Sequence, residues 1–502
     1  PRRVGALGVG GVSRAANQLP NVFFEVAAGV ALAAVAVPVI ASQLARDDET
    51  GADQTASAML TWSLTVLAPL SILMAAAAAP LSGLLVDKQR CSGSTDLMAS
   101  MLVVFAPQIA LYGVGIVLAG VLQAHRRFLA AAMAPLLSSV VVMATYLLYA
   151  AMAQGRGDDL ARLPGSASTV LATGTTLGVV ALSLPLLIPV HRAGIRLSLS
   201  WTFPEGVARR ARALAGAGLL ALVAQQLAVL VALWVSQHRG GPGTLNVYTY
   251  VQAVYLLPYA VLAVPVATAA FPAMATGRDG AVMATGLDRS LVVADSAQAS
   301  VDHAQQTLAG AARAITVATC AGAAVLFAVA PPIGAFFSAL DAGRHSPAGQ
   351  EALAALPDAL SAFAPGLVGF GLIALLTRAL YVRGRPGVAG GVAALGWLIA
   401  AALPVMVLHD HSGPRRTLQS LGFASSLGMT ICTIGLLFAV RKAWGPKAFD
   451  GLVRTATVAV GSGVFTAALG RAVADLLDPQ GPAAGGGAAG WGSGGVLTLT
   501  AA

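Results

Sequence analysis

Long apolar runs separated by short polar connections dominate this chain. Crossing the hydrocarbon of a membrane takes about 20 apolar residues in a helix. Twelve runs approach or exceed that length, and they cover roughly residues 22–41, 58–86, 100–122, 128–152, 167–190, 211–237, 246–275, 312–340, 356–382, 387–408, 418–440 and 451–477. The pattern predicts an all-α polytopic membrane protein with about twelve complete transmembrane helices.

The two ends of the chain suggest further helices. Residues 4–18 are apolar but short and rich in glycine, so we interpret them as the remnant of an earlier helix. The stretch 451–502 is predicted to hold one or more additional C-terminal helices, because its last residues resume an apolar pattern. Restoring both ends would give fourteen helices, and we expect both ends to be trimmed.

Basic residues in the connections predict how the helices are oriented. Alternate connections, beginning with 42–57, hold more than twice as many Lys and Arg residues as the other set. Cytoplasmic loops carry this excess, so the first set is predicted to be cytoplasmic. The strongly basic linker 191–212 is expected to form an amphipathic helix on the cytoplasmic membrane surface.

A repeat divides the chain into two halves. The tripeptide Phe-Ala-Pro occurs at 105–107 and again at 363–365, and each copy is followed by a similar Gly- and Leu-rich helix. Six predicted helices separate the copies, so both run in the same direction across the membrane. Such parallel repeats are typical of transporters. We therefore predict an N-lobe at 1–200 and a C-lobe at 201–450 around a central cavity.

Composition excludes several classes of function. Hydrophobic residues make up 57% of the chain and charged residues only 10%, whereas soluble domains carry about 25% charged residues. The net charge of +9 is therefore assigned to membrane topology, not to nucleic-acid binding. The sequence has no phosphate-binding GxxxxGK[ST] loop, no HExxH and no GxSxG. We expect no enzyme, no metal site and no cofactor.

Polar residues inside the apolar runs are the candidate site residues, since such groups tend to face a bundle interior or a wet cavity. Glu25 faces either the cavity or the membrane interface. Gln225 and Gln226 contact either neighbouring helices or the substrate. Gln252 lies among tyrosines that form either an interfacial belt or a cavity wall.

Three segments carry a resemblance to a known family: LPN at 19–21 with VPVIA at 37–41, the stretch 106–137 around Pro107-Gln108, and the stretch 248–275. They resemble the MurJ (MviN) family of lipid II flippases, which belongs to the multidrug/oligosaccharidyl-lipid/polysaccharide exporter superfamily. The resemblance implies fourteen helices in two lobes. It also implies export of a lipid-linked peptidoglycan precursor by alternating access in the bacterial cytoplasmic membrane.

The resemblance carries over only some site residues. Asn21 and Gln108 match the family pattern. The positions of the family's cavity arginines hold Phe24, Glu25 and Ala253, although a diphosphate favours cationic donors. The alternatives are a drug or cation antiporter, with Glu25 as the coupling carboxylate, and a non-transporting cell-envelope scaffold. The implied partners are a lipid-linked glycan, membrane lipids, a coupling ion and cell-wall synthesis proteins.

Overall fold

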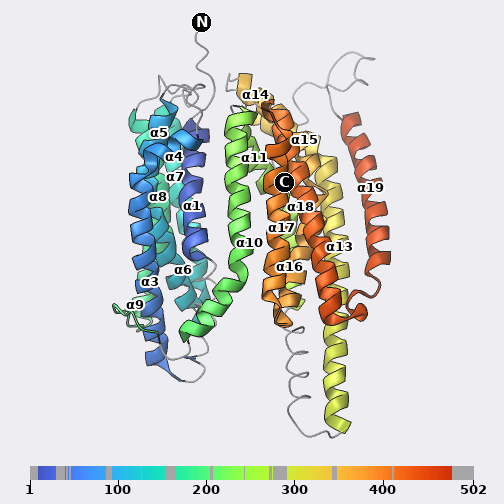
Figure 1. Cartoon of the computed structure of the whole chain (residues 1–502). Helices are drawn as coiled ribbons and strands as arrows, with labels where there is room; N and C mark the ends of the chain where they lie inside the picture. The colour runs from blue at the N-terminus through green and yellow to red at the C-terminus, as the bar shows by residue number, and fades with distance from the viewer. Residues whose placement is uncertain are drawn as a thin grey trace.

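The computed structural model consists of long helices packed side by side (Figure 1). It describes residues 9–29, 40, 43–44, 47–85, 93–125, 127–153, 165–203, 207–241, 243–270, 274, 291–341, 347–409 and 412–477. The first half contains α1 (Val9–Phe24), η1 (Glu25–Gly29), α3 (Glu49–Ala76), α4 (Ala78–Leu85), α5 (Ser94–Phe105), α6 (Gln108–Ala124), α7 (Phe128–Ala153), α8 (Gly165–Ser183), η2 (Leu184–Leu186) and α9 (Leu187–Arg192). The second half contains α10 (Val207–Val235), η3 (Ser236–Gly240), α11 (Thr244–Pro258), η4 (Tyr259–Ala263), α13 (Leu291–Asp341), α14 (Pro347–Ala354), α15 (Leu356–Phe363), α16 (Gly366–Val382), α17 (Pro386–Val407), α18 (Gly413–Trp444), η5 (Pro446–Phe449) and α19 (Leu452–Leu477).

The polytopic membrane architecture is confirmed. Within the described ranges, ten helices are long and apolar enough to cross a membrane, and an eleventh span results if the pair 349–363 and 366–382, bent by 51°, is one span. Large apolar side chains on the outward faces of these helices are more than two-thirds exposed, among them Ile72, Leu147 and Phe438. Such surfaces are suited to contact with lipid.

The first helix was predicted to begin near residue 22, but the described helix already includes Val9. Residues 9–24 form one α-helix that continues directly into η1, so residues 9–18 of the apolar stretch are not a separate remnant, and residues 4–8 lie outside the described residues. Pro20 stands just before the predicted run 22–41, where a proline is typical of the start of a helix. It lies inside the helix instead, where neighbouring membrane helices can satisfy the freed backbone groups. Residues 30–39 of the predicted run lie outside the described residues.

The helices form two groups that follow the order of the chain (Figure 1). Equivalent pairs pack together in each group: α3 with α6 and α13 with α16, and likewise α7 with α8 and α17 with α18. A buried apolar cluster in the first group extends from Val12 to Ile195, and two more occupy the second group. This arrangement is a parallel repeat of helices. The boundaries at 200 and 450 stay a prediction.

The repeated Phe-Ala-Pro motif breaks a helix in both groups. Gln108 begins α6 after the first break, and Gly366 begins α16 after the second. Backbone hydrogen bonds around the two breaks correspond position by position at an offset of 258 residues: Ala106 and Ala364 donate to Leu102 and Leu360, and Arg127 and Arg385 donate to Leu122 and Leu380. The predicted repeat is therefore present in the backbone as well as in the sequence.

The linker between the two groups is not the expected amphipathic helix. After α9, residues 195–203 have no helical structure and run along the start of α3. Backbone N–H groups of this segment donate to side chains spaced four residues apart on α3: Arg196 to Asp53 (3.1 Å), Ser198 to Ser57 (3.0 Å) and Ser200 to Thr61 (3.2 Å). A polar stripe on one helix face therefore replaces the hydrogen bonds that a helical linker would have made internally.

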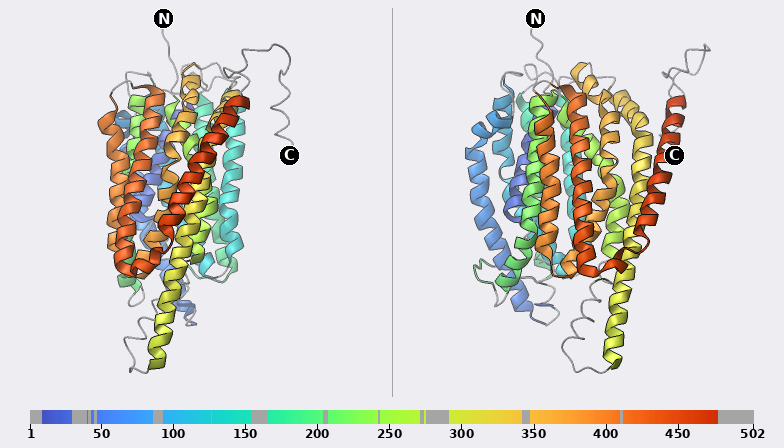
Figure 2. Two further views of the ribbon diagram at one scale, coloured as in Figure 1. Left: turned by 90° about the vertical axis from the view of Figure 1, so that its right-hand side faces the viewer. Right: turned by 45° about the vertical axis from the view of Figure 1, so that its right-hand side comes forward.

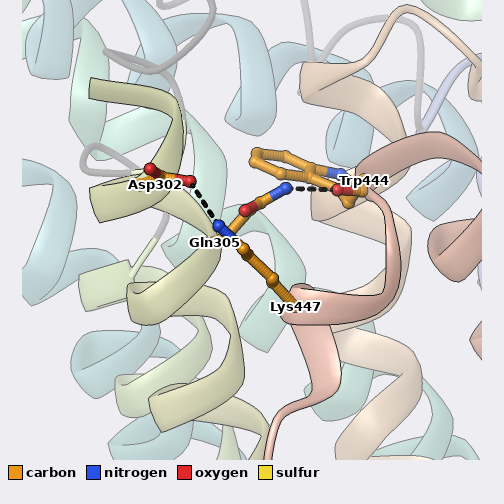
Figure 3. A network of polar contacts seen from close by, with 4 residues as sticks. All are labelled: Asp302, Gln305, Trp444 and Lys447. Atoms are coloured by element: carbon orange, nitrogen blue, oxygen red, sulfur yellow. Dashed lines mark hydrogen bonds and ion pairs between the residues drawn. The ribbon is translucent and has the colours of Figure 1, made fainter. Parts of the chain in front are cut away.

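Helix α13 is far longer than a membrane span. Its first turns project beyond the other helices, at the end of the molecule opposite the start of α1 (Figure 2). Close to this end, α13 contacts the segment that follows α18 (Figure 3). Gln305 donates a hydrogen bond to the carbonyl of Trp444, and Lys447 pairs with Asp302 at 3.5 Å. These contacts join α13 to the last turn of α18 and to η5.

Candidate functional site at the lobe interface

The two groups of helices meet along α1 and η1 from the first group and α10 and α11 from the second. We call this contact the lobe interface. Leu233 and Leu245 of the second group pack into the apolar cluster of the first. Transporters with two lobes bind substrate and change conformation at such an interface, so it is the candidate site in this chain.

Arg14 is the main polar link across the lobe interface. It lies on α1, one turn and a half before the Leu-Pro-Asn motif, and is half-buried. Its guanidinium donates to the hydroxyl of Tyr250 at 3.3 Å and to the backbone carbonyl of Asn246 at 3.5 Å. The guanidinium carbon also lies 4.9 Å from the centre of the Tyr250 ring, within the range of a cation–π contact.

Tyr250 is itself fixed from the second group of helices. Its ring stacks on that of Phe337, near the end of α13, with the centroids 5.0 Å apart and the planes 14° from parallel. The partner of Arg14 is therefore held by the packing of α11 against α13. The side-chain oxygens of Asn17 and Asn246 are buried nearby along the same helices and have no hydrogen-bond partner among the described residues.

The three helices that meet at the lobe interface, α1, α10 and α11, are each followed by an irregular turn. Within the described ranges, π-helical segments occur at Glu25–Gly29, Ser236–Gly240 and Tyr259–Ala263. They follow α1, α10 and α11, which are the helices that meet at the lobe interface. π-helical turns interrupt the regular ladder of backbone hydrogen bonds and are frequent at functional sites. Each of the three helices α1, α10 and α11 is therefore followed by one irregular turn.

Glu25 begins the first of these π-helical segments. Its side chain is half-buried and forms no hydrogen bond or ion pair with another described residue. The helix begins at Val9, so Glu25 lies more than four turns from the helix start and not one turn into it, as the sequence suggested. Glu25 is therefore not at the start of this helix, and its place at the cavity or at the membrane interface stays a prediction.

Three of the glutamines predicted as site residues lie on the interface helices α10 and α11. Gln226 is buried and Gln225 is half-buried on α10, the helix that contacts both η1 and α17. Gln252 donates to the hydroxyl of Tyr248 on its own helix at 2.9 Å. These residues lie on the interface helices, and their contact with substrate stays a prediction.

Asn21 and Gln108 are placed differently. Asn21 is exposed on α1. Gln108 is fully buried at the break between α5 and α6, where it donates to the hydroxyl of Thr176 on α8 at 3.0 Å. The Thr176 hydroxyl in turn donates to the carbonyl of Val104 at 3.0 Å. The side-chain N–H group of Gln108 therefore takes part in the hydrogen bonds at the broken helix, whereas its side-chain oxygen is buried without a partner among the described residues.

Sequence reasoning did not identify Arg14 as a candidate. The residue stands in the short stretch that we interpreted as a remnant, so its charge was not counted as lying within a membrane helix. The available signal was its spacing from the Leu-Pro-Asn motif, which places both within a single helix. At the positions where the resemblance led us to expect arginines, Phe24 is buried against Tyr112 at 5.6 Å and Ala253 is exposed.

Solved structures of transporters share this fold. The chain resembles a lipid II flippase MurJ in an inward closed conformation, with 16% identity, a TM-score of 0.63 and 94% of each chain covered. It also resembles an inward-facing MATE family transporter of the MOP superfamily, with 16% identity, a TM-score of 0.67 and 88% and 93% of the two chains covered. A Vibrio cholerae MATE transporter in the bent form has 13% identity and a TM-score of 0.53, and covers 86% and 89%.

The sequence assigns the chain within this superfamily. The family model described as lipid II flippase MurJ matches residues 4–476, which is nearly the full chain. This match includes both repeated breaks, the lobe interface and α19. The chain therefore belongs to the MurJ family of lipid II flippases.

Proposed function

We propose that this protein moves lipid II from the inner to the outer leaflet of a bacterial cytoplasmic membrane by alternating access. The match to the family over residues 4–476 is the observation that carries the proposal. The parallel repeat and the polar lobe interface support it, because a two-lobe transporter exposes a site between its lobes to each side in turn.

The physical problem is to carry a charged head group across hydrocarbon about 30 Å thick. An ionised group transferred into an apolar medium without partners loses its hydration at a prohibitive cost. Polar side chains at the lobe interface, among them Arg14, Asn17 and Gln226, would replace part of that hydration. The lipid tail can meanwhile remain in the surrounding bilayer, against the apolar outer faces of the helices.

Glu25 is the residue that we assign to a coupling ion in this mechanism. It is a carboxylate without a partner among the described residues, and it lies where α1 loses regular helical geometry. An ion that binds there would favour one arrangement of the lobes over the other if its affinity differs between them. Proteins of cell-wall synthesis are the expected partners, because they use the exported precursor.

The test is export of lipid II in bacteria depleted of their own flippase and expressing the full chain. Lipid II in the outer leaflet is measured by its cleavage with an enzyme that does not cross the membrane. We expect expression to restore cleavage. Cells without the chain are the control, and surface labelling confirms insertion. If the protein is inserted and lipid II stays protected, the proposal fails.

A further inference from the structure

A cavity of about 480 Å³ lies between the end of α17 and the start of α18. Both helices belong to the second group, and the turn between them lies at the end of the molecule at which α1 begins (Figure 1). The connection before α3 is at the opposite end and is predicted to be cytoplasmic, so we expect the cavity to open on the outer side of the membrane. Its volume is that of an ordinary ligand pocket.

One wall of this cavity is a polar face of α18. Ser412 stands at the start of the helix, and Arg416 and Ser420 follow at intervals of four residues, which places all three on one face. Gln419 lines the cavity beside Ser420. From Ser412 to Ser420 this polar face extends about 12 Å along the helix axis.

Three side chains of the polar face have unused hydrogen-bonding groups. Arg416, Gln419 and Ser420 form no side-chain hydrogen bond or ion pair with another described residue. Hydroxyls elsewhere on the membrane helices donate to the carbonyl four residues earlier, as those of Thr145 and Thr430 do. Polar groups without partners are costly at membrane depth. Their concentration on one wall of a cavity indicates a ligand that supplies the missing partners.

The opposite part of the cavity is apolar. Leu403 and Val407 of α17 and Phe423 of α18 line it. Val407 and Phe423 are 57% and 61% exposed, and they lie on outward faces suited to contact with lipid. Phe423 is farther from the helix start than the polar face, so the lining changes from polar at the helix ends to apolar toward the centre of the bilayer. An amphiphile has the same order of groups.

The shape of the cavity is held by bonds within the protein. Arg239 of η3 donates to the carbonyls of Val405 and Leu408, each at 2.7 Å, and so fixes the end of α17. The backbone N–H of His409 donates to the hydroxyl of Ser412 at 3.1 Å, and this hydroxyl donates to the carbonyl of His409 at 2.6 Å. The cavity is therefore formed without a ligand, as most ligand sites are.

Two neighbouring arginines differ in their surroundings. Arg415 pairs with Asp358 of α15 at 2.5 Å. Arg416 lines the cavity and has no anionic partner among the described residues. A guanidinium presents its donors in a planar fork that matches two phosphate oxygens at once. The unpaired charge at the polar end of the cavity therefore favours a phosphate group.

We propose that this cavity binds an anionic glycerophospholipid of the outer leaflet. Its phosphate lies on Arg416, its ester carbonyls accept from Gln419 and Ser420, and one acyl chain lies along Phe423. The lipid is a bound component of the second group of helices and is not the transported molecule. The site is distant from the lobe interface in the fold, and the proposal does not rest on the proposed function.

The test is a titration of the full chain in detergent micelles, followed by native mass spectrometry. The probes are phosphatidylglycerol and phosphatidylcholine with the same acyl chains. We expect the wild type to bind phosphatidylglycerol about ten-fold more tightly, the increment of one charge-assisted contact. Arg416→Gln is expected to bring the two affinities close to parity. Arg415→Gln is the matched control, because it removes the same charge one residue away but outside the cavity, and it should keep the preference.

A second variant tests the deeper contact. Gln419→Leu removes the donor assigned to the ester carbonyls, which both lipids share. It should weaken both lipids by about three-fold, the effect of one neutral hydrogen bond, and leave the preference unchanged.

Three outcomes would overturn the proposal. An equal loss of preference in Arg415→Gln and Arg416→Gln would mean that lipid is attracted only by the general charge of the surface. Displacement of phosphatidylglycerol by an equal concentration of inorganic phosphate would make the site one for a free anion. If Arg416→Gln does not elute as a folded monodisperse protein, Ser420→Leu, which fills the cavity, decides, and unchanged binding of phosphatidylglycerol in that variant contradicts the site.

Discussion

The two broken helices of the repeat solve the same problem with different residues. In each break a backbone carbonyl four residues before the new helix accepts a hydrogen bond from a neighbouring helix: Val104 from Thr176, and Ala362 from Ser426. In the first copy the hydroxyl also accepts from the side chain of Gln108. In the second copy it accepts from the backbone N–H of Gly366 at 3.1 Å.

The difference lies in how closely the neighbouring helix approaches. A Cβ atom placed on Gly366 would lie 2.7 Å from the Cα of Ser426, closer than real side chains come. The second copy therefore brings backbone to within reach of a short hydroxyl, whereas the first bridges a wider gap with a glutamine. Small residues that allow close approach are a main source of helix association in membranes. Both copies keep the hydrogen bond to the broken helix, but the distance between that helix and its neighbour differs.

Placing the glutamine of the first copy at the start of α16, where the second copy has Gly366, should have the largest effect on stability. Gly366→Gln inserts a side chain against the backbone of α18, and we expect a loss of about 3 kcal/mol in the free energy of unfolding, the upper end of the usual cost of overpacking. Denaturant unfolding in micelles measures the loss. Gly387→Gln is the matched control, since a Cβ there meets nothing within 4 Å. An equal loss in both variants would contradict the close approach.

Removing the hydroxyl of the second copy should have the next largest effect. Ser426→Ala leaves the N–H of Gly366 and the carbonyl of Ala362 without this partner, and we expect a loss of about 2 kcal/mol in the free energy of unfolding. Ser361→Ala is the control, because its hydroxyl bonds only within its own helix, to Pro357. Similar stability of the two variants would show that the hydroxyl is dispensable.

The smallest effect on stability is expected at Gln108, and its measurement tests whether the two broken helices differ in function as well as in packing. Gln108→Leu keeps the bulk of the side chain and removes one hydrogen bond to Thr176, so stability should fall by about 1 kcal/mol. Export of lipid II should be unchanged in the depletion assay. A loss of export at wild-type stability would instead place Gln108 in contact with substrate, as the family resemblance suggests.

Much of the fold could be predicted because it depends on properties of single segments. Apolar run length predicted the spans, and the spacing of Phe-Ala-Pro predicted the repeat. The errors concern residues whose surroundings depend on tertiary packing. The first helix was predicted to begin after Pro20, because the cost of a proline inside a helix depends on neighbouring helices that the sequence does not show. The linker at 195–203 was taken for a helix because the polar stripe on α3 that holds it is distant in sequence.

The candidate site was harder to predict than the fold. Glu25 and the glutamines attracted attention as polar residues in apolar runs, which is a local property. Arg14 depends on Tyr250, more than two hundred residues away, and on Phe337 behind it. No local pattern indicates such a contact. Arg14 also stands in the short stretch that we interpreted as a remnant, so it was not counted as a residue of a membrane helix.

The length of α13 has a mechanical consequence. Its 51 residues, at 1.5 Å each, make a rod of about 75 Å, more than twice the thickness of the hydrocarbon. A tilt of only about 10° around its far end would displace the projecting tip by roughly 13 Å, given that length. A rotation of α13 within the bilayer would therefore displace its projecting end in the aqueous phase by more than any part of the helix inside the hydrocarbon.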